Sequence, residues 1–107
     1  MAESAKSPIQ RYSPSTLTDM WTVPADTEAT VNIVACNQNS QRATFSIAIA
    51  PNGETAANEH YLCRDTPVDA NRPFQAVVGI TLHTGAVVRV QGVGFSFQLF
   101  RIERDTA

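Results

Sequence analysis

The 107-residue chain has few charged side chains and no large excess of either sign. Asp, Glu, Lys and Arg make up 17% of the sequence, below the ~25% of typical soluble domains, so we expect a surface rich in small polar residues. The net charge of −2 provides no basic field to attract phosphates, which argues against nucleic-acid binding. A weakly charged surface suits a protein that packs against neighbours, and it equally suits an exposed Thr- and Ser-rich β-sheet face.

Cysteine and long hydrophobic segments are also scarce. Cys36 and Cys63 provide no disulfide framework, so we expect two free thiols, with a single bridge as the alternative. Their spacing relative to His60 and His83 matches no zinc-ligand pattern, and no metal is expected. No segment approaches the ~20 apolar residues of a membrane helix. Residues 1–15 lack the apolar segment of a signal peptide, so we expect synthesis in a cytoplasm without secretion.

No catalytic set is visible in the sequence. Glu59 and His60 are adjacent, and on the strand expected there they would point to opposite faces and could not cooperate. His83 lies in a turn, where a solvated side chain is expected. Gly92-Val93-Gly94 is followed by no helix, which excludes a phosphate-binding loop. We therefore predict no enzymatic activity, no cofactor and no small-molecule ligand.

The clearest positive signal is the alternation of side chains over residues 42–50. Ala43, Phe45, Ile47 and Ile49 fall on one face of a strand, and Thr44, Ser46, Ala48 and Ala50 fall on the other. Turn residues separate short segments of this kind along the chain. The expected strands cover residues 17–23, 29–37, 42–50, 60–64, 74–80, 86–90 and 95–102, with a long loop over 65–73.

About seven short strands and no helical periodicity predict an all-β fold. We expect an antiparallel β-sandwich over residues 17–107, Ig-like or jelly-roll in layout, with a small barrel as the alternative architecture. Residues 1–16 form an extended N-terminal arm, because Pro8 and Pro14 disfavour a helix and few large apolar groups are present. A neighbouring subunit would order this arm, or it would lie along its own domain.

Four residues are candidates for an interface, namely Tyr12, Trp21, Phe100 and Ile102. Trp21 is the only tryptophan, and core or interface packing is the common role of such a residue. The last strand is apolar on both faces: Phe95, Phe97 and Leu99 can fill the core, which leaves Phe100 and Ile102 without cover. The first strand, the arm or a satellite cluster inside the domain would cover them, or a partner subunit would.

Several stretches, in order, resemble a known family. Residues 17–25 resemble LTDLYTVPAG, residues 34–37 resemble VVCN, and residues 44–53 resemble TFRIAVAPDG. Further along, residues 58–65 resemble NKHYLYYD, residues 79–90 resemble GLTLAAGDVVRV, and residues 95–100 resemble LSFNLFG. The departures include Met20-Trp21 in place of Leu-Tyr, Cys63 in place of Tyr, Ala86 in place of Asp and Arg101 in place of Gly.

This pattern is similar to that of small virion-associated proteins of tailed bacteriophages and cyanophages, and it extends from about residue 17 to residue 103. The resemblance implies a β-sandwich and a non-enzymatic structural role in the virion. A capsid decoration or cement protein is the first expectation, and a tail, baseplate or tail-fibre component is the alternative. The expected partners are the major capsid protein or tail proteins and further copies of the chain. A free carbohydrate-binding domain is a third reading, disfavoured by the lack of a signal peptide.

Overall fold

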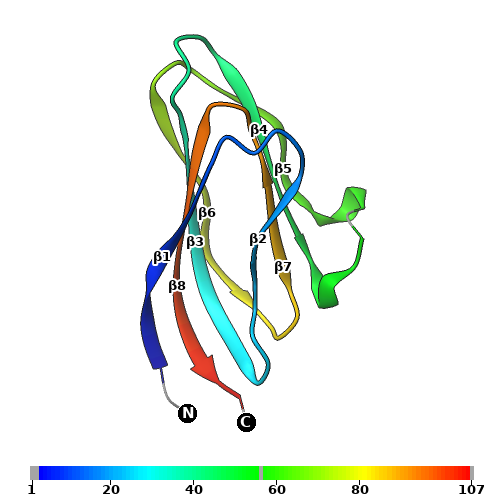
Figure 1. The fold of residues 1–107 in the computed structure, drawn as a ribbon. Coiled ribbons are helices and arrows are strands. Elements are labelled where there is room, and N and C mark those ends of the chain that lie inside the picture. Colours follow the sequence, from blue (N-terminus) through cyan, green and yellow to red (C-terminus); the bar gives the residue numbers. More distant parts are fainter. Residues whose placement is uncertain (1–2, 56, 107) are drawn as a thin grey trace.

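The computed structural model describes residues 3–55 and 57–106, and it is a sandwich of two antiparallel four-stranded sheets (Figure 1). The predicted all-β sandwich is confirmed. Seven of the strands correspond to predicted ones, and the eighth lies in the N-terminal arm. The strands are β1 (Glu3–Tyr12), β2 (Thr18–Thr22), β3 (Thr27–Asn37), β4 (Ala43–Ala50), β5 (Tyr61–Val68), β6 (Arg72–Leu82), β7 (Val87–Gln91) and β8 (Phe95–Asp105). Two single-turn 3₁₀ helices, η1 (Pro51–Gly53) and η2 (Asn58–His60), connect β4 to β5.

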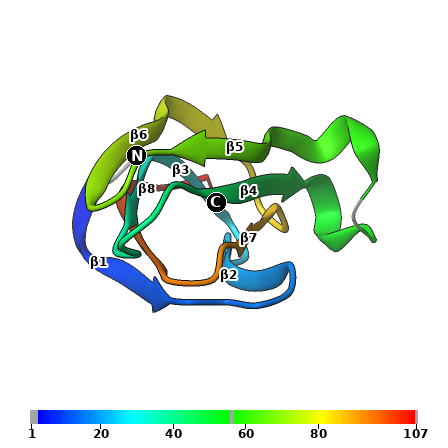
Figure 2. The same ribbon diagram turned by 90° about the horizontal axis from the view of Figure 1, so that it is seen from above.

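The strand order identifies a jelly roll, one of the two layouts that the sequence left open. One sheet has the order β1-β8-β3-β6 and the other the order β2-β7-β4-β5. The first strand pairs with the last, the second with the seventh, the third with the sixth and the fourth with the fifth. These pairs alternate between the sheets, as in a long antiparallel ribbon wrapped around itself. Seen from above, the strands surround a common interior (Figure 2).

The N-terminal arm lies along its own domain as an edge strand. β1 pairs with β8 from Glu3 opposite Arg104 to Tyr12 opposite Ser96, with an irregularity between Lys6 and Ile9. The side chain of Ile9 packs against the hydrophobic core. In this structure the arm is thus ordered by its own domain, which is the second of the two alternatives raised by the sequence.

The long loop expected over residues 65–73 is mostly strand, and this prediction was wrong. β5 extends to Val68 and β6 begins at Arg72, which leaves only residues 69–71 as a turn. Pro67 and Pro73 lie inside these strands. Both strands are sheet edges, where one side of the backbone has no ladder partner, so a residue without an N–H is tolerated.

The core lies between the two sheets and centres on three phenylalanines. Phe45, Phe95 and Phe97 are 0–1% exposed, and their ring centroids lie 5.4–6.1 Å apart. Ile47 packs in the same cluster, which confirms the inward face predicted for residues 42–50. Around these rings lie further buried side chains, including Val31, Ile33, Val77, Val88, Val90 and Leu99.

The opposite face of β4 is less exposed than the sequence suggested. Ser46, Ala48 and Ala50 are all below 5% exposed. The segment between β4 and β5 accounts for part of this cover, because η2 contacts β4. The Arg89 side chain reaches from β7 to donate a hydrogen bond to the Glu54 carbonyl at 2.8 Å. Small side chains on this face therefore lie under a local cap.

A buried asparagine joins the β3–β4 loop to the β5–β6 turn at one end of the sandwich. Asn37 ends β3 and is 0% exposed. Its Nδ2 donates to the carbonyls of Val68 at 2.9 Å, Gln41 at 3.1 Å and Asp69 at 3.3 Å. Its Oδ1 accepts hydrogen bonds from Asn39 N and Asn39 Nδ2, both at 2.9 Å. This single amide satisfies polar groups of the β3–β4 loop and the β5–β6 turn at once.

Candidate interaction surface

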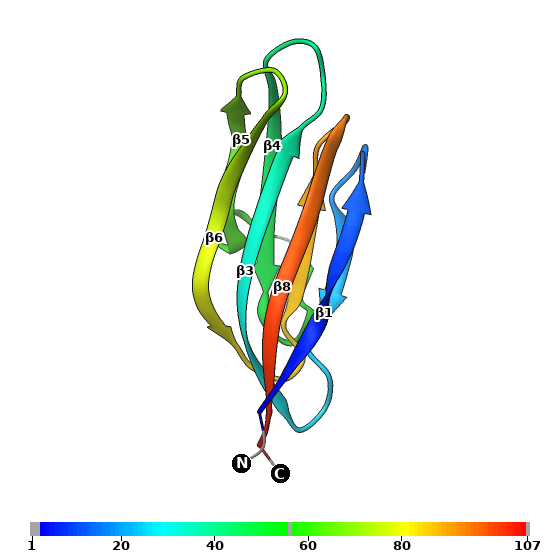
Figure 3. The ribbon, with the colours of Figure 1, turned by 90° about the vertical axis from the view of Figure 1, so that its left-hand side faces the viewer.

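The outward side of the β1-β8-β3-β6 sheet is a broad face that no segment in the described part of the chain crosses (Figure 3). Alternation along the strands and the pairing register decide which side chains point outward. The hydroxyls of Thr30 and Thr81 meet at 3.3 Å across β3 and β6, which shows that both lie on one face. Apart from the Glu28–Arg104 pair at one end, the outward residues of β3, β6 and β8 are uncharged, and we define them as the open face: Thr30, Asn32, Val34, Cys36, Pro73, Gln75, Val78, Thr81, Ser96, Gln98, Phe100 and Ile102.

Two of the candidate interface residues lie at the middle of the open face. Phe100 is 40% exposed and Ile102 is 45% exposed, and they stand opposite Asn32 and Thr30 of β3. With Lys6 and Arg101, these four residues line a hollow of about 290 Å³. The sequence left open whether the domain itself or a partner would cover these two side chains, and in this structure both remain partly exposed. Such large side chains remain accessible to a partner.

Tyr12, the third candidate, borders the same face from β1. Its side chain is 64% exposed and stands opposite Ser96 of β8. A second hollow of about 400 Å³ is lined by Tyr12, Gln10, Arg11, Gln38, Ser96, Phe97 and Gln98. An aromatic side chain beside several amides offers apolar contact and hydrogen bonds together, a combination common at protein interfaces.

Charge is confined to the margins of the open face. Glu28 and Arg104 lie at one end and form an ion pair at 2.9 Å, and Arg104 also donates to the Thr30 hydroxyl at 2.9 Å. Lys6 borders the hollow beside Phe100. The outward charges of β3 and β8, Glu28 and Arg104, pair with each other, so docking over these strands requires no burial of an unpaired charge from them.

Trp21, the fourth candidate, lies apart from the open face. It is half-buried and packs against the core at the margin of the sandwich. The Arg101 guanidinium lies 5.0 Å from the centre of its ring, in a cation–π contact. Arg101 Nε also donates to Glu103 Oε2 at 2.8 Å. The Trp21 ring is therefore already in contact with a side chain of its own domain.

Val78 departs from the simple alternation of its strand, because a β-bulge shifts the pattern of β6. Strict alternation over residues 74–80 would group Val78 with Ala76 and Ile80, but Val77 is 2% exposed and Val78 is 63% exposed. Gly79 adopts a φ of +64°, and its N–H donates to Asn32 Oδ1 at 2.7 Å. A glycine inside a strand pattern is the sequence signal of such a bulge.

The cysteines are free, as predicted, and lie on different sheets. Cys36 is on the open face, whereas Cys63 of β5 packs against the core. Burial raises the pKa of the Cys63 thiol above its usual range, although a hydrogen bond with Thr66 lowers it in part. Cys63 is therefore a thiol rather than a thiolate at neutral pH.

Histidine takes part in local structure rather than in a recognisable catalytic pair. His60 ends η2 and is buried, and its Nδ1 accepts the Ala57 N–H at 3.1 Å. Its Nε2 lies 3.7 Å from Glu54 Oε1, so its acidic neighbour is Glu54 and not Glu59. Over residues 3–55 and 57–106, no three metal-ligating side chains cluster, and no helix is long and apolar enough to cross a membrane.

Comparison with known proteins identified no relative of this chain. No protein-family model, no curated protein and no solved structure matches the chain. The function is therefore inferred from the chain's own residues and from their arrangement in the jelly roll.

Proposed function

We propose that this chain is a non-enzymatic structural protein of a bacteriophage virion, which decorates and stabilises the assembled capsid. The observation that carries the proposal is the open face, with uncovered Phe100 and Ile102 on an uncharged sheet surface. The resemblance of residues 17–103 to small virion-associated proteins agrees with it. The open face is the surface that would dock on the major capsid protein.

The dimensions of this sheet are adequate for a stable contact. Strands of 11 residues at ~3.4 Å per residue, in four rows ~4.8 Å apart, give a face of roughly 700 Å². A standard protein interface buries about 800 Å² on each partner. A docked partner that covers this sheet and a few margin residues reaches that size.

The distribution of side chains also resembles that of protein interfaces. Phe100, Ile102 and Tyr12 supply the apolar anchors, and burial of the exposed part of each would contribute about 1 kcal/mol. The Gln and Thr side chains around them can hydrogen-bond to a partner, and the Glu28–Arg104 pair lies at the margin. An apolar centre with a polar rim is the usual anatomy of a specific contact.

The jelly roll is compatible with this role but does not establish it. This fold occurs in viral capsid proteins, and it also occurs in lectins and cupins. One fold can host many functions, so the function has to be inferred from the surface residues rather than from the fold. The uncharged open face favours attachment to another protein.

A sedimentation assay on phage particles that lack this protein tests the proposal. Purified wild-type protein is expected to co-sediment with the particles. The double variant Phe100→Thr and Ile102→Thr should bind at least tenfold more weakly, because it loses the apolar anchors while threonine, a good strand residue, preserves β8. Leu62→Thr is the matched control, since Leu62 is 47% exposed on the other sheet. Unchanged binding of the double variant, with circular dichroism identical to wild type, would contradict docking through the open face.

The position on the particle is decided by immunogold electron microscopy of the phage that encodes the protein. Label over the heads is expected for a capsid decoration protein. Label at the tail or its tip would replace that assignment with the tail, baseplate or tail-fibre alternative. An absence of label, with monomeric protein left in the supernatant, would refute the virion role itself.

A further inference from the structure

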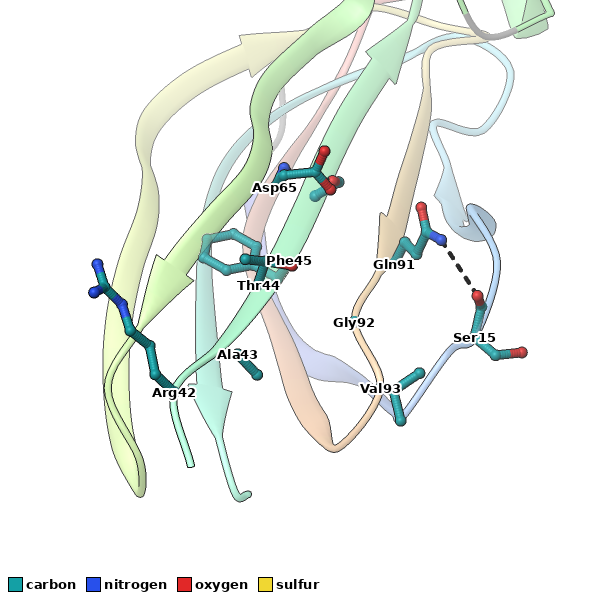
Figure 4. Close-up of a pocket in the computed structure, with 10 residues that line it drawn as sticks. Ser15, Arg42, Ala43, Thr44, Phe45, Asp65, Gln91, Gly92 and Val93 are labelled. Atoms are coloured by element: carbon teal, nitrogen blue, oxygen red, sulfur yellow. Dashed lines mark hydrogen bonds between the residues drawn. The ribbon is translucent and has the colours of Figure 1, made fainter. Parts of the chain in front are cut away.

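The opposite side of the sandwich carries a polar pocket that the virion role does not explain. It lies on the β2-β7-β4-β5 sheet, next to the end of the β4–β7 pairing at Ser46 and Gln91 (Figure 4). Its volume is about 470 Å³. The lining includes the apolar residues Ala43, Phe45 and Val93 and the polar residues Ser15, Arg42, Thr44, Ser46, Asp65 and Gln91.

Asp65 is the most distinctive group of the pocket. It adopts a φ of +48° inside β5, and its N–H donates to Ser46 Oγ at 3.0 Å. This bond ties the Asp65 backbone to β4, and Figure 4 shows the side chain extending over β4 towards β7. Within the described part of the chain, no group donates a hydrogen bond to this carboxylate or forms an ion pair with it. An anchored acceptor with unused capacity is thus held above the pocket.

Other polar groups around Asp65 retain bonding capacity as well. Gln91 donates its amide N–H to the Ser15 carbonyl at 3.2 Å, which fixes the side chain and leaves its oxygen as an acceptor. The Thr44 hydroxyl can both donate and accept. Arg42 lies at the rim, and among the described residues its one ion-pair contact is to Asp69 at 3.9 Å, so its guanidinium still has donors to offer.

This set of groups selects a class of ligand. The unpaired negative charge of Asp65 would repel a phosphate or carboxylate ligand, so an anionic ligand is disfavoured. A divalent cation requires several oxygen ligands, and the described residues form no such cluster. A ligand hydroxyl group can both donate and accept hydrogen bonds. It can therefore pair with the carboxylate, the amide oxygen, the hydroxyls and the guanidinium that surround the partly apolar floor of this pocket. We propose that this pocket binds a neutral carbohydrate, with Asp65 accepting hydrogen bonds from sugar hydroxyls.

The pocket and the open face belong to different sheets of the sandwich. A protein attached to a particle through the open face would leave the pocket accessible from outside. The carbohydrate site does not depend on that attachment, because it is built from residues of this chain alone. This proposal differs from the prediction made from the sequence, which was that the protein has no small-molecule ligand.

The test is an NMR titration of the ¹⁵N-labelled full-length protein with free sugars as probes. Glucose, galactose, mannose, rhamnose and N-acetylglucosamine are each added at millimolar concentrations. At least one is expected to shift the amide signals of Thr44, Asp65 and Gln91 in a saturable way. Asp65→Asn should weaken that binding about tenfold, because charge-assisted hydrogen bonds are roughly twice as strong as neutral ones.

Asp65→Asn is a mild change to the fold, because asparagine tolerates a positive φ almost uniquely well among non-glycine residues. Asp26→Asn is the matched control: Asp26 is an exposed aspartate with a φ of +53° in the turn between β2 and β3. Its affinity for the sugar should equal that of wild type. The proposal is overturned if none of the sugars produces saturable shifts at the pocket, or if Asp65→Asn binds as well as wild type. Neither result would bear on particle attachment, which the sedimentation assay measures.

Discussion

Replacement of Asn37 by alanine should unfold the end of the sandwich at which the β3–β4 loop meets the β5–β6 turn. The side chain is 0% exposed and makes hydrogen bonds to the Val68, Gln41 and Asp69 carbonyls and to Asn39. The bond to Val68 is buried, so its loss leaves a desolvated carbonyl that costs about 1–3 kcal/mol. The others are partly accessible to water and cost about 0.5–1 kcal/mol each.

The expected loss of unfolding free energy is therefore at least about 3 kcal/mol, a large share of the roughly 5–15 kcal/mol of a typical domain. For a chain of this length it corresponds to a fall in melting temperature of about 15 °C. Urea unfolding followed by circular dichroism measures the free energy, and thermal unfolding measures the temperature. Asn32→Ala is the matched control, because Asn32 accepts one hydrogen bond, from the Gly79 N–H, at an exposed site. That variant should lose less than about 1 kcal/mol.

The variant Asn37→Asp tests the same hydrogen bonds through the pH dependence of stability. The introduced carboxyl can keep the bonds from Asn39, but when ionised it cannot donate to Val68 or Asp69. Burial and the facing carbonyls should raise its folded-state pKa, so stability is retained at low pH and lost as pH rises through the ordinary carboxyl range. The reasoning is refuted if Asn37→Ala costs no more than Asn32→Ala, or if the stability of Asn37→Asp does not depend on pH.

Two further predictions concern the backbone and the thiols. Gly94→Ala should destabilise the fold by more than about 2 kcal/mol, because Gly94 has a φ of +77° and an added Cβ would collide with the Asn39 side chain; a melting temperature equal to wild type would contradict this. Cys63 in a Cys36→Ser background should react slowly with a thiol reagent at neutral pH, because its pKa is raised by burial, and the rate should rise only at more alkaline pH than for an unfolded control. The same shift means that the contribution of Cys63 to stability is present below the ordinary thiol pKa and is lost as pH rises above it.

Local patterns were sufficient to predict seven of the eight strands, although not β1 or the full lengths of β5 and β6. Residues 42–50 alternate with a period of two, and the inward positions of Phe45 and Ile47 follow from that period alone. The same logic placed Phe97 and Leu99 in the core and Phe100 and Ile102 on the other side of the last strand. Predictions of side-chain direction failed where a backbone irregularity interrupts the alternation, as at the bulge around Gly79, beside which Val78 points outward.

The candidate sites were harder to predict, because they depend on contacts between distant segments. The sequence named Phe100 and Ile102 but could not tell whether they would be covered, and it placed Trp21 with them although Arg101 stacks on that ring at the core margin. The pocket around Asp65 has no motif at all. It joins Ser15, Arg42 and Gln91 from three different parts of the chain, and only strand pairing brings them together.

The sequence by itself determined that this protein is an all-β sandwich with a phenylalanine-rich core, since side-chain alternation and turn residues act within a few positions of the chain. Tertiary structure decided that the sandwich is a jelly roll, that the N-terminal arm is its edge strand, and which faces stay uncovered. The physical reason is that pairing such as that of β1 with β8 joins the two ends of the chain. The choice of partner depends on how all the strands share one core, which no local pattern records.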